Sequence, residues 1–261
     1  MTKFKYGMCL SDYQKNQEYM NLSKKRSLGR IPEPEHAKAT AKIIKQLCRK
    51  KFSLLDIGSQ TGHFFKTFEK VFKSRINYIG LDPYTIHTIE GKKIWKNFKN
   101  CNFKLGWVQK IPMKDKSVDL TLCSNVLTHI PSIGKPIKEM IRVTKKFIIF
   151  RTPVHHRSYR IQMVYNKNVW KYSNVKPENE FDNKGKPREY NYFDVHSKDY
   201  LTGQIKKYSK KAKIKFVKDT FWNAKNINRK SEKKTVPTKI IAGNQVADLL
   251  IIPNYFVVIK L

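Results

Sequence analysis

The stretch from Leu54 to Phe65 most restricts the fold, because an apolar run there breaks at a glycine-punctuated turn and then resumes at helical spacing. This pattern predicts a strand, a ligand-binding loop and a helix. Gly58 and Gly62 can adopt backbone angles that other residues avoid, and they let a ligand approach the main chain. The unpaired N–H groups at the start of such a helix favour a carboxylate or a phosphate in the loop.

A second predicted strand, Ile76 to Leu81, is followed by Asp82. In doubly wound sheets an acidic residue at this strand end accepts hydrogen bonds from ribose hydroxyls. A nicotinamide-binding domain would carry the fingerprint Gly-x-Gly-x-x-Gly in the preceding turn. Here Gln60 stands where that pattern has its second glycine. The turn therefore does not match the nicotinamide fingerprint.

The Asp-x-Gly-x-x-x-Gly turn at 56–62, the strand end at 78–82 and the segment from Ile111 to Ile130 occur in this order. Together they resemble the class I S-adenosylmethionine-dependent methyltransferases, and within them the small-molecule-type branch. The resemblance covers residues 50–152 well and the rest poorly. It implies an antiparallel last strand next to the strand before it.

Strand and helix patterns alternate along the chain, which predicts an α/β fold with a parallel sheet and helices on both faces. With the resemblance, the expected fold is a doubly wound, Rossmann-like, seven-stranded sheet that is mostly parallel. The expected strands lie near 52–57, 76–81, 102–108, 118–123, 146–151, 214–222 and 254–261. The expected helices lie near 35–49, 62–73, 85–99, 133–144 and 198–211, and Ser197 is the expected N-cap of the last one.

We expect residues 1–34 to form an N-terminal lid or helical extension and residues 35–261 to form the methyltransferase domain. Residues 154–195 lack periodicity and are rich in Tyr and Asn. We interpret them as an insertion over the carboxyl ends of the strands. Residues 223–250 are expected to carry a basic loop.

The resemblance assigns the residues that would contact S-adenosylmethionine. The turn would hold the methionine part, Asp82 would bind the ribose, and residues after the third strand would contact the adenine. Two positions depart from the family pattern: Gln60 replaces a frequent glycine, and Trp107 stands where relatives commonly have an acidic residue. The expected cofactor-binding residues are Asp56, Gly58, Ser59, Gln60, Gly62, Asp82, Trp107, Val108 and Ser124.

Residues after the fourth strand lie at the switch point of the sheet, where ligands bind in open α/β folds. Asn125 and His129 are the catalytic candidates there, since histidine can remove a proton near neutral pH. His155, His156 and His196 are weaker candidates for an acceptor pocket. No metal site is expected, because Cys9, Cys48, Cys101 and Cys123 are widely spaced and form no Cys-x-x-Cys pair.

The chain has 261 residues and a formal net charge of +34, and the excess of Lys and Arg is locally extreme over 201–239. Such a charge attracts polyanions, so nucleic acid is a possible partner. A general bias toward Lys, Asn and Ile explains the same charge without a binding role. The sequence shows neither a membrane-spanning apolar run nor a secretory signal, and we expect a cytoplasmic protein. Its oligomeric state is left open.

The sequence supports three hypotheses about function. The leading hypothesis is methyl transfer from S-adenosylmethionine to an oxygen or nitrogen of a small-molecule acceptor. The alternative is an RNA methyltransferase that uses the Lys-rich 201–239 region. Against it, Ser124-Asn125-Val126-Leu127 stands where base-methylating enzymes carry an Asn-Pro-Pro-Tyr-like motif. A second alternative is a cofactor-binding module without catalysis.

Overall fold

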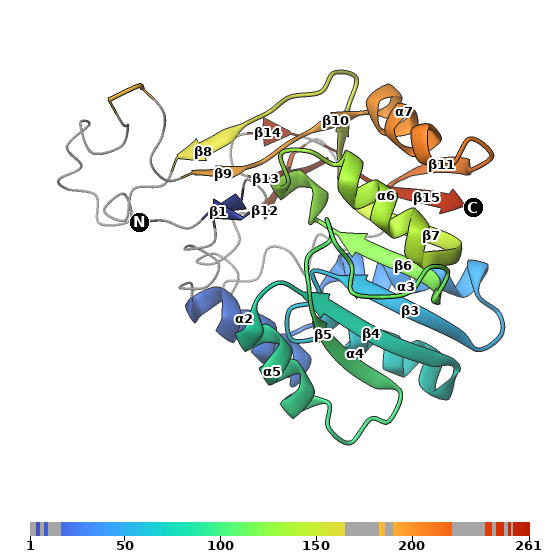
Figure 1. The fold of residues 1–261 in the computed structure, drawn as a ribbon. Helices are drawn as coiled ribbons and strands as arrows, with labels where there is room; N and C mark the ends of the chain where they lie inside the picture. The colour runs from blue at the N-terminus through green and yellow to red at the C-terminus, as the bar shows by residue number, and fades with distance from the viewer. Residues whose placement is uncertain are drawn as a thin grey trace, which may run out of the picture.

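The computed structural model describes residues 4–5, 8–9, 17–164, 183–185, 190–220, 238–241, 244–247, 250–251 and 253–261. Its main sheet has eight strands. Seven form one row, and the short strand β10 (His196–Ser197) pairs with the end of β7. In the row, β15 runs antiparallel to both of its neighbours while the other neighbours pair in parallel. The predicted fold class is confirmed (Figure 1). The order is β11 (Lys213–Lys218), β15 (Asn254–Lys260), β7 (Thr144–His155), β6 (Val118–Ser124), β3 (Phe52–Ile57), β4 (Ile76–Asp82) and β5 (Cys101–Leu105).

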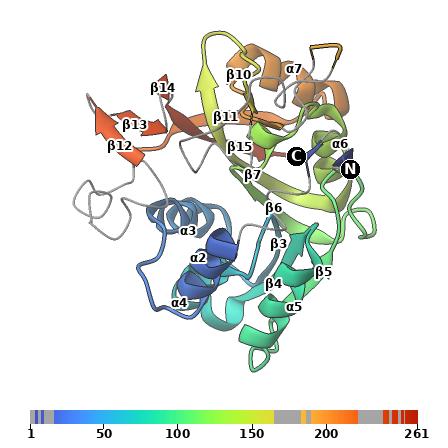
Figure 2. The same ribbon diagram turned by 90° about the vertical axis from the view of Figure 1, so that its left-hand side faces the viewer.

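Helices cover both faces of this sheet (Figures 1 and 2). Buried residues of α3 (Glu35–Leu47) and α4 (His63–Phe72) join one hydrophobic cluster with β3, β4 and β5. Residues of α6 (Gly134–Val143) and α7 (Lys198–Tyr208) join a second cluster on the other face. The helix α2 (Gln17–Ser27) packs on α4, and α5 (Thr85–Ile94) packs on β4 and β5.

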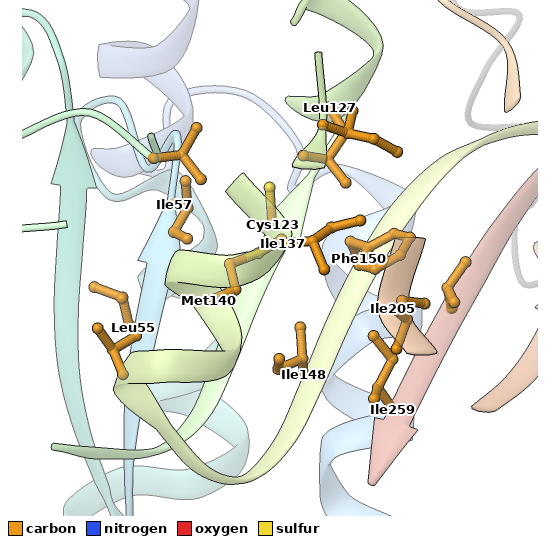
Figure 3. Close-up of a cluster of buried hydrophobic side chains, with 14 of the residues drawn as sticks. Leu55, Ile57, Cys123, Leu127, Ile137, Met140, Ile148, Phe150, Ile205 and Ile259 are labelled. Carbon is orange, nitrogen blue, oxygen red and sulfur yellow. The ribbon is translucent and has the colours of Figure 1, made fainter. Parts of the chain in front are cut away.

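The second cluster shows which apolar side chains hold α6 and α7 against the sheet. Along β3, Leu55 and Ile57 point to the same face, where they meet the buried side of α6 (Figure 3). Ile137 and Met140 stand one helical turn apart on α6 and point toward the sheet. Ile205 of α7 reaches Ile259 of β15 in the same cluster. Burial of these side chains fixes the register of the parallel strands.

Several element boundaries differ from the predicted ones. Strand β7 is longer than the expected 146–151, β11 ends at Lys218 rather than near 222, and α7 ends at Tyr208 rather than near 211. Helix α5 ends at Ile94 rather than near 99, because the indole N–H of Trp95 donates to the Thr61 carbonyl at 3.0 Å and the chain then turns. Strand β5 ends at Leu105 rather than near 108, because the chain turns at Trp107, whose carbonyl accepts from the Lys110 N–H at 3.0 Å. The predicted N-cap is confirmed, since the Ser197 side chain accepts a hydrogen bond from the Tyr200 N–H at 3.1 Å.

Small sheets lie outside the main one. Strands β1 (Phe4–Lys5) and β2 (Met8–Cys9) pair, as do β8 (Gln162–Val164) and β9 (Tyr190–Tyr192). The part of the expected basic loop that the structure describes is an antiparallel sheet of β12 (Thr238–Ile241), β13 (Asn244–Ala247) and β14 (Leu250–Ile251). Most of the expected insertion and residues 221–237 lie outside the described residues.

Two further observations concern the described part of the chain. No helix in it is long and apolar enough to cross a membrane. Cys48, Cys101 and Cys123 are free thiols. Burial raises the pKa of Cys48 to about 11, so this thiol is protonated and unreactive near neutral pH.

Candidate active site

The loop between β3 and α4 holds three residues in the left-handed backbone region. Gly58, Gln60 and Gly62 have φ values of 75°, 50° and 81°. A Cβ on Gly58 would lie 2.4 Å from Cγ2 of Val126, and a Cβ on Gly62 would lie 2.6 Å from Cζ of Phe103. Both glycines are therefore required by backbone angle and by protein packing. The N–H groups of Gly58, Ser59 and Gly62 donate to main-chain carbonyls, so internal hydrogen bonds also hold the loop in this conformation.

The same loop is tied to helix α2 through buried hydroxyls. Oγ1 of Thr61 lies 2.7 Å from Oγ of Ser23 and 2.9 Å from Oγ of Ser27. The Ser27 hydroxyl also contacts the Thr61 carbonyl at 3.2 Å. All three side chains are buried, so the loop conformation and the position of α2 depend on each other.

Asp82 is at the end of β4, as predicted, and its carboxylate is buried against the loop. Oδ2 accepts from the Gln60 N–H at 2.9 Å, and Oδ1 accepts from the Tyr84 N–H at 3.0 Å. Nδ1 of His87 is also 3.0 Å from Oδ1. A carboxylate offers about four lone-pair positions, so these contacts leave one on Oδ2.

His87 was not among the predicted site residues. It lies on the buried side of α5, five residues after Asp82. A carboxylate at a strand end followed by a histidine in the next helical turn is the signal that could have found it. Since the carboxylate accepts, the Nδ1–H tautomer of His87 fits this contact.

Asp56 lies inside the sheet, one strand away from Asp82. Its Oδ2 accepts a hydrogen bond from the Tyr78 hydroxyl at 2.6 Å, and both side chains are buried. Burial is the main cause that raises the pKa of Asp56 to about 7, and Asp82 adds to the rise. The hydrogen bond between Asp56 and Tyr78 thus lies in the interior of the sheet.

The segment after β5 reaches the same edge of the sheet. Gly106 donates to the Asp82 carbonyl at 3.0 Å, and Lys110 donates to the Trp107 carbonyl, as described above. Val108 is buried in the cluster that contains Leu81, while Trp107 is partly exposed. Trp107 and Val108 therefore lie next to the end of β4 that carries Asp82, on the side where β5 pairs with β4.

Ser124 is the last residue of β6, and Asn125 follows it on the other side of the loop. Asn125 has a φ of 56°, and its N–H donates to the Arg151 carbonyl at 2.9 Å. Its Oδ1 accepts from Nη1 of Arg151 at 2.7 Å. Nε of Arg151 donates to Oδ2 of Asp219 at 2.7 Å, and both of these side chains are buried. Sequence reasoning missed Arg151 and Asp219, because no pattern connects residues so far apart in the chain.

His129 is in η2 (Leu127–His129), just beyond Asn125. Its Nδ1 lies 2.9 Å from the Tyr192 carbonyl, and burial lowers its pKa. Thr128 also donates to the Asp194 carbonyl at 2.9 Å. The segment around 192–196 therefore lies against the end of β6.

The other predicted histidines are near this segment. His196 is in β10 (His196–Ser197), which pairs with the end of β7, and burial lowers its pKa to about 4. The rings of His155 and His156 are 4.0 Å apart, and His155 also contacts Tyr159. These imidazoles lie near the carboxyl end of β7, and His196 also contacts the backbone of Leu127 just after β6.

Several buried polar atoms at this edge have no hydrogen-bond partner among the residues that the structure describes. They lie at the carboxyl ends of β3, β6 and β7 and on adjoining segments. Leaving such an atom unpaired costs about 1 to 3 kcal/mol, so a ligand that pairs with it would be stabilised here. The atoms are Ser59 Oγ, Ser124 Oγ, His63 Nδ1, Thr152 Oγ1, His155 Nδ1 and His196 Nε2.

This donor set fits a nucleoside with an attached amino acid. The edge provides a glycine-containing loop, a buried carboxylate with one remaining lone pair, a partly exposed indole and unpaired hydroxyls. No group of three metal-ligating side chains occurs in the described part of the chain. The family described as "Methyltransferase domain" matches residues 48–208.

The chain belongs to the family of class I S-adenosylmethionine-dependent methyltransferases. Among curated proteins, it is 28% identical over 102 residues to the uncharacterized methyltransferase YcgJ of Bacillus subtilis, which covers 38% of this chain and 39% of that protein. It is 25% identical over 169 residues to the ubiquinone/menaquinone biosynthesis C-methyltransferase UbiE of Rickettsia massiliae, covering 57% of this chain and 66% of that one. The matched parts thus span less than two thirds of these relatives.

Solved structures show the same fold at low identity. The crystal structure of YcgJ from Bacillus subtilis has a TM-score of 0.50 and 15% identity, covering 87% of this chain and 98% of that one. The cyclase SpnF has a TM-score of 0.53 and 10% identity, covering 85% of this chain and 80% of that one. The predicted family and fold are both confirmed.

Proposed function

We propose that this methyltransferase transfers a methyl group from S-adenosylmethionine to an oxygen or nitrogen of a small-molecule acceptor. The observation that carries the cofactor part is the Asp82 carboxylate, which is held by the Gln60 N–H and keeps one lone pair at the end of β4. A ribose hydroxyl donates to such a carboxylate in doubly wound folds. The family match supports the choice of cofactor.

The residues would divide the cofactor between them. When bound, S-adenosylmethionine supplies a methyl group on a positively charged sulfur. Asp82 would accept one ribose hydroxyl through Oδ2, and the partly exposed Trp107 would stack on the adenine while Val108 packs beside it. The loop from Gly58 to Gly62 would lie against the methionine part, and its N–H groups, which all donate within the protein, would hold it in this conformation. The unpaired hydroxyls of Ser59 and Ser124 would gain partners from the ligand.

Asn125 and His129 would face the acceptor. His129 donates from Nδ1 to the Tyr192 carbonyl, so this tautomer carries its basic lone pair on Nε2. Its lowered pKa keeps the imidazole neutral near pH 7, which is the state that accepts a proton from an O–H or N–H nucleophile. His129 is therefore our candidate general base, and His155 and His196 are candidates for acceptor contacts.

The basic charge is the observation behind the alternative, RNA methylation. Lys207, Lys210 and Lys211 are exposed near the end of α7, where they add positive charge. Lys206, however, donates from Nζ to the carbonyls of Lys210 and Ala212, so it stabilises the turn after α7. Exposed lysines on the edge strand β11 also discourage pairing with other chains. Small-molecule methylation remains our proposal, and Lys233 and Lys234 lie outside the described residues.

Calorimetric titration of the full chain with S-adenosylmethionine and S-adenosylhomocysteine tests the cofactor part, and no heat of binding to either would contradict it.

A methyl-labelled donor then tests the acceptor, with a small-metabolite fraction and purified RNA as separate substrates. The carbon chemical shift of the transferred methyl group identifies the acceptor atom. Label on oxygen or nitrogen supports the proposal, whereas label on carbon would align the chain with its UbiE relatives. Label only in RNA would favour the alternative, and binding without turnover would favour a non-catalytic module.

A further inference from the structure

Three residues from distant parts of the chain meet beside the loop at the end of β6. Arg151 is on β7, its Nε donates to Asp219 just after β11, and its Nη1 donates to Asn125. The Arg151 and Asp219 side chains are 4% and 3% exposed. A charge-assisted pair at this depth holds its geometry, because separating the charges would leave both of them buried.

Arg151 decides which way the amide of Asn125 faces. A guanidinium has only N–H donors, so the group of Asn125 that contacts it must be the carbonyl oxygen. The NH2 group of Asn125 then points away from Arg151. Among the described residues this NH2 group has no hydrogen-bond partner. Asn125 therefore presents two donors and no acceptor on that side.

Asn125 and its two N–H donors lie on one side of the loop, and the residues predicted to bind the nucleoside lie on the other. Val126, the next residue, lies against Gly58 of the loop. Asp82 and Trp107 lie across the loop, at the ends of β4 and β5. Asn125 is thus between the loop and the end of β7, on the side opposite the predicted ribose and adenine contacts. In the proposed function, the acceptor would approach the transferred methyl group from this side.

We propose that Asn125 is a specificity-determining residue that selects an acceptor carrying an oxyanion, such as a carboxylate, and that Arg151 and Asp219 position it. This inference rests on the proposed function and adds the class of acceptor. The carbonyl of Asn125 accepts from a guanidinium, which polarises the amide and strengthens its N–H donors. A cationic acceptor would meet only donors from the Asn125 amide. An uncharged acceptor would gain less from the two N–H groups than an oxyanion does.

Binding of matched probes to the full chain saturated with S-adenosylhomocysteine tests this proposal. The probes are benzoate, benzamide and benzylamine, together with butyrate, butyramide and butylamine, measured by ligand-observed NMR. We expect at least one carboxylate to bind the wild type about tenfold more tightly than its amide and amine partners. Equal or weaker binding of both carboxylates would overturn the proposal.

Asn125→Asp is the decisive variant, because Arg151 can still hold one carboxylate oxygen while the other replaces the NH2 group by an acceptor. We expect carboxylate affinity to fall about tenfold or more and the preference for carboxylate over amine to reverse. Asn125→Ser should lower carboxylate affinity without reversing the preference. A merely structural role would weaken all probes alike, and that result would contradict the proposal.

Two controls separate this inference from the proposed function. Asn77→Asp makes the same change on an exposed position of β4 and should leave every affinity within about twofold. The affinity of each variant for S-adenosylhomocysteine should also stay within about twofold. If Asn125→Asp lowers it tenfold, the amide contacts the cofactor and the proposal is wrong. If the wild type does not bind S-adenosylhomocysteine, the proposed function fails first.

Discussion

Asp56 of β3 accepts a hydrogen bond from the Tyr78 hydroxyl of β4 across the parallel pair, with 2.6 Å between the two oxygens. Both side chains are buried below the loop that holds Gly58. Burial raises the pKa of Asp56 to about 7 and raises that of Tyr78 as well. The pair therefore couples the stability of the central sheet to pH in the neutral range.

The pH dependence of unfolding has a definite sign at Asp56. Its pKa is higher in the folded state than the ordinary value of 3.8, so the folded chain binds this proton more tightly. Its contribution is therefore fully present below about pH 4 and is lost as the pH rises toward 7, at a cost of roughly 4 kcal/mol as an upper limit. Buried histidines, whose pKa values are lowered, act in the opposite direction.

Asp56→Asn isolates this effect, because the amide oxygen can still accept from Tyr78 while the titration is removed. We expect the free energy of unfolding of the variant, relative to the wild type, to increase between about pH 4 and pH 7. Urea denaturation at several pH values measures the difference. A difference that stays constant over this range would show that the pKa of Asp56 is the same in the folded and unfolded chain, which would contradict the prediction.

Replacing Asp82 should affect both stability and cofactor binding. Asp82→Ala leaves the N–H groups of Gln60 and Tyr84 and the His87 ring without their acceptor, at about 1 to 3 kcal/mol for each buried donor. Asp82→Asn keeps one acceptor oxygen and should melt at a higher temperature than Asp82→Ala. We expect both to bind S-adenosylhomocysteine at least about tenfold more weakly in calorimetric titration. As a control, Asp115→Ala removes an exposed ion pair and should bind normally. Wild-type affinity in Asp82→Ala would contradict the site.

Gly58→Ala tests the packing of the loop. The added Cβ would meet Val126 at 2.4 Å, and alanine is strained at a φ of 75°. We expect a lower melting temperature and weaker S-adenosylhomocysteine binding. Adding Val126→Ala removes the clash but not the backbone strain, so the double variant should recover part of the loss. A double variant less stable than the sum of the two single changes would rule out this steric explanation.

The buried pair of Arg151 and Asp219 should be sensitive to one-sided changes. Asp219→Ala leaves a buried guanidinium without its carboxylate and should cost about 3 to 5 kcal/mol in urea denaturation. Replacing both residues by apolar ones, Arg151→Met with Asp219→Leu, should cost less than the single change. An Asp219→Ala variant as stable as the wild type would mean that water reaches the guanidinium.

The helices and strands could be predicted because the burial of one face sets the spacing of apolar residues in the sequence. The apolar run from Phe52 gave the bounds of β3 as 52–57, which the structure confirms. The helix after Tyr84 was predicted too long, because its end depends on Trp95, whose indole donates to Thr61 in another part of the chain. Local periodicity carries no information about such a contact.

The candidate site was predictable where it follows the strand ends. Asp82 and Asn125 occupy the positions expected from the sheet topology, at the ends of β4 and β6. Their partners were not predictable. Arg151 meets Asp219 only because β15 lies between β7 and β11, and an arginine within an apolar strand gives no indication of its partner.

The hydroxyl contacts between α2 and Thr61 have a consequence for the smallest fragment that can fold. A chain that begins at Glu35 would lack Ser23 and Ser27, and the buried hydroxyl and N–H of Thr61 would lose their acceptors. The prolines at 32 and 34 look like a natural place to cut, yet such a cut would remove part of the loop's own support. We therefore expect a shortened expression product to fold better when it includes α2, from residue 17 onward.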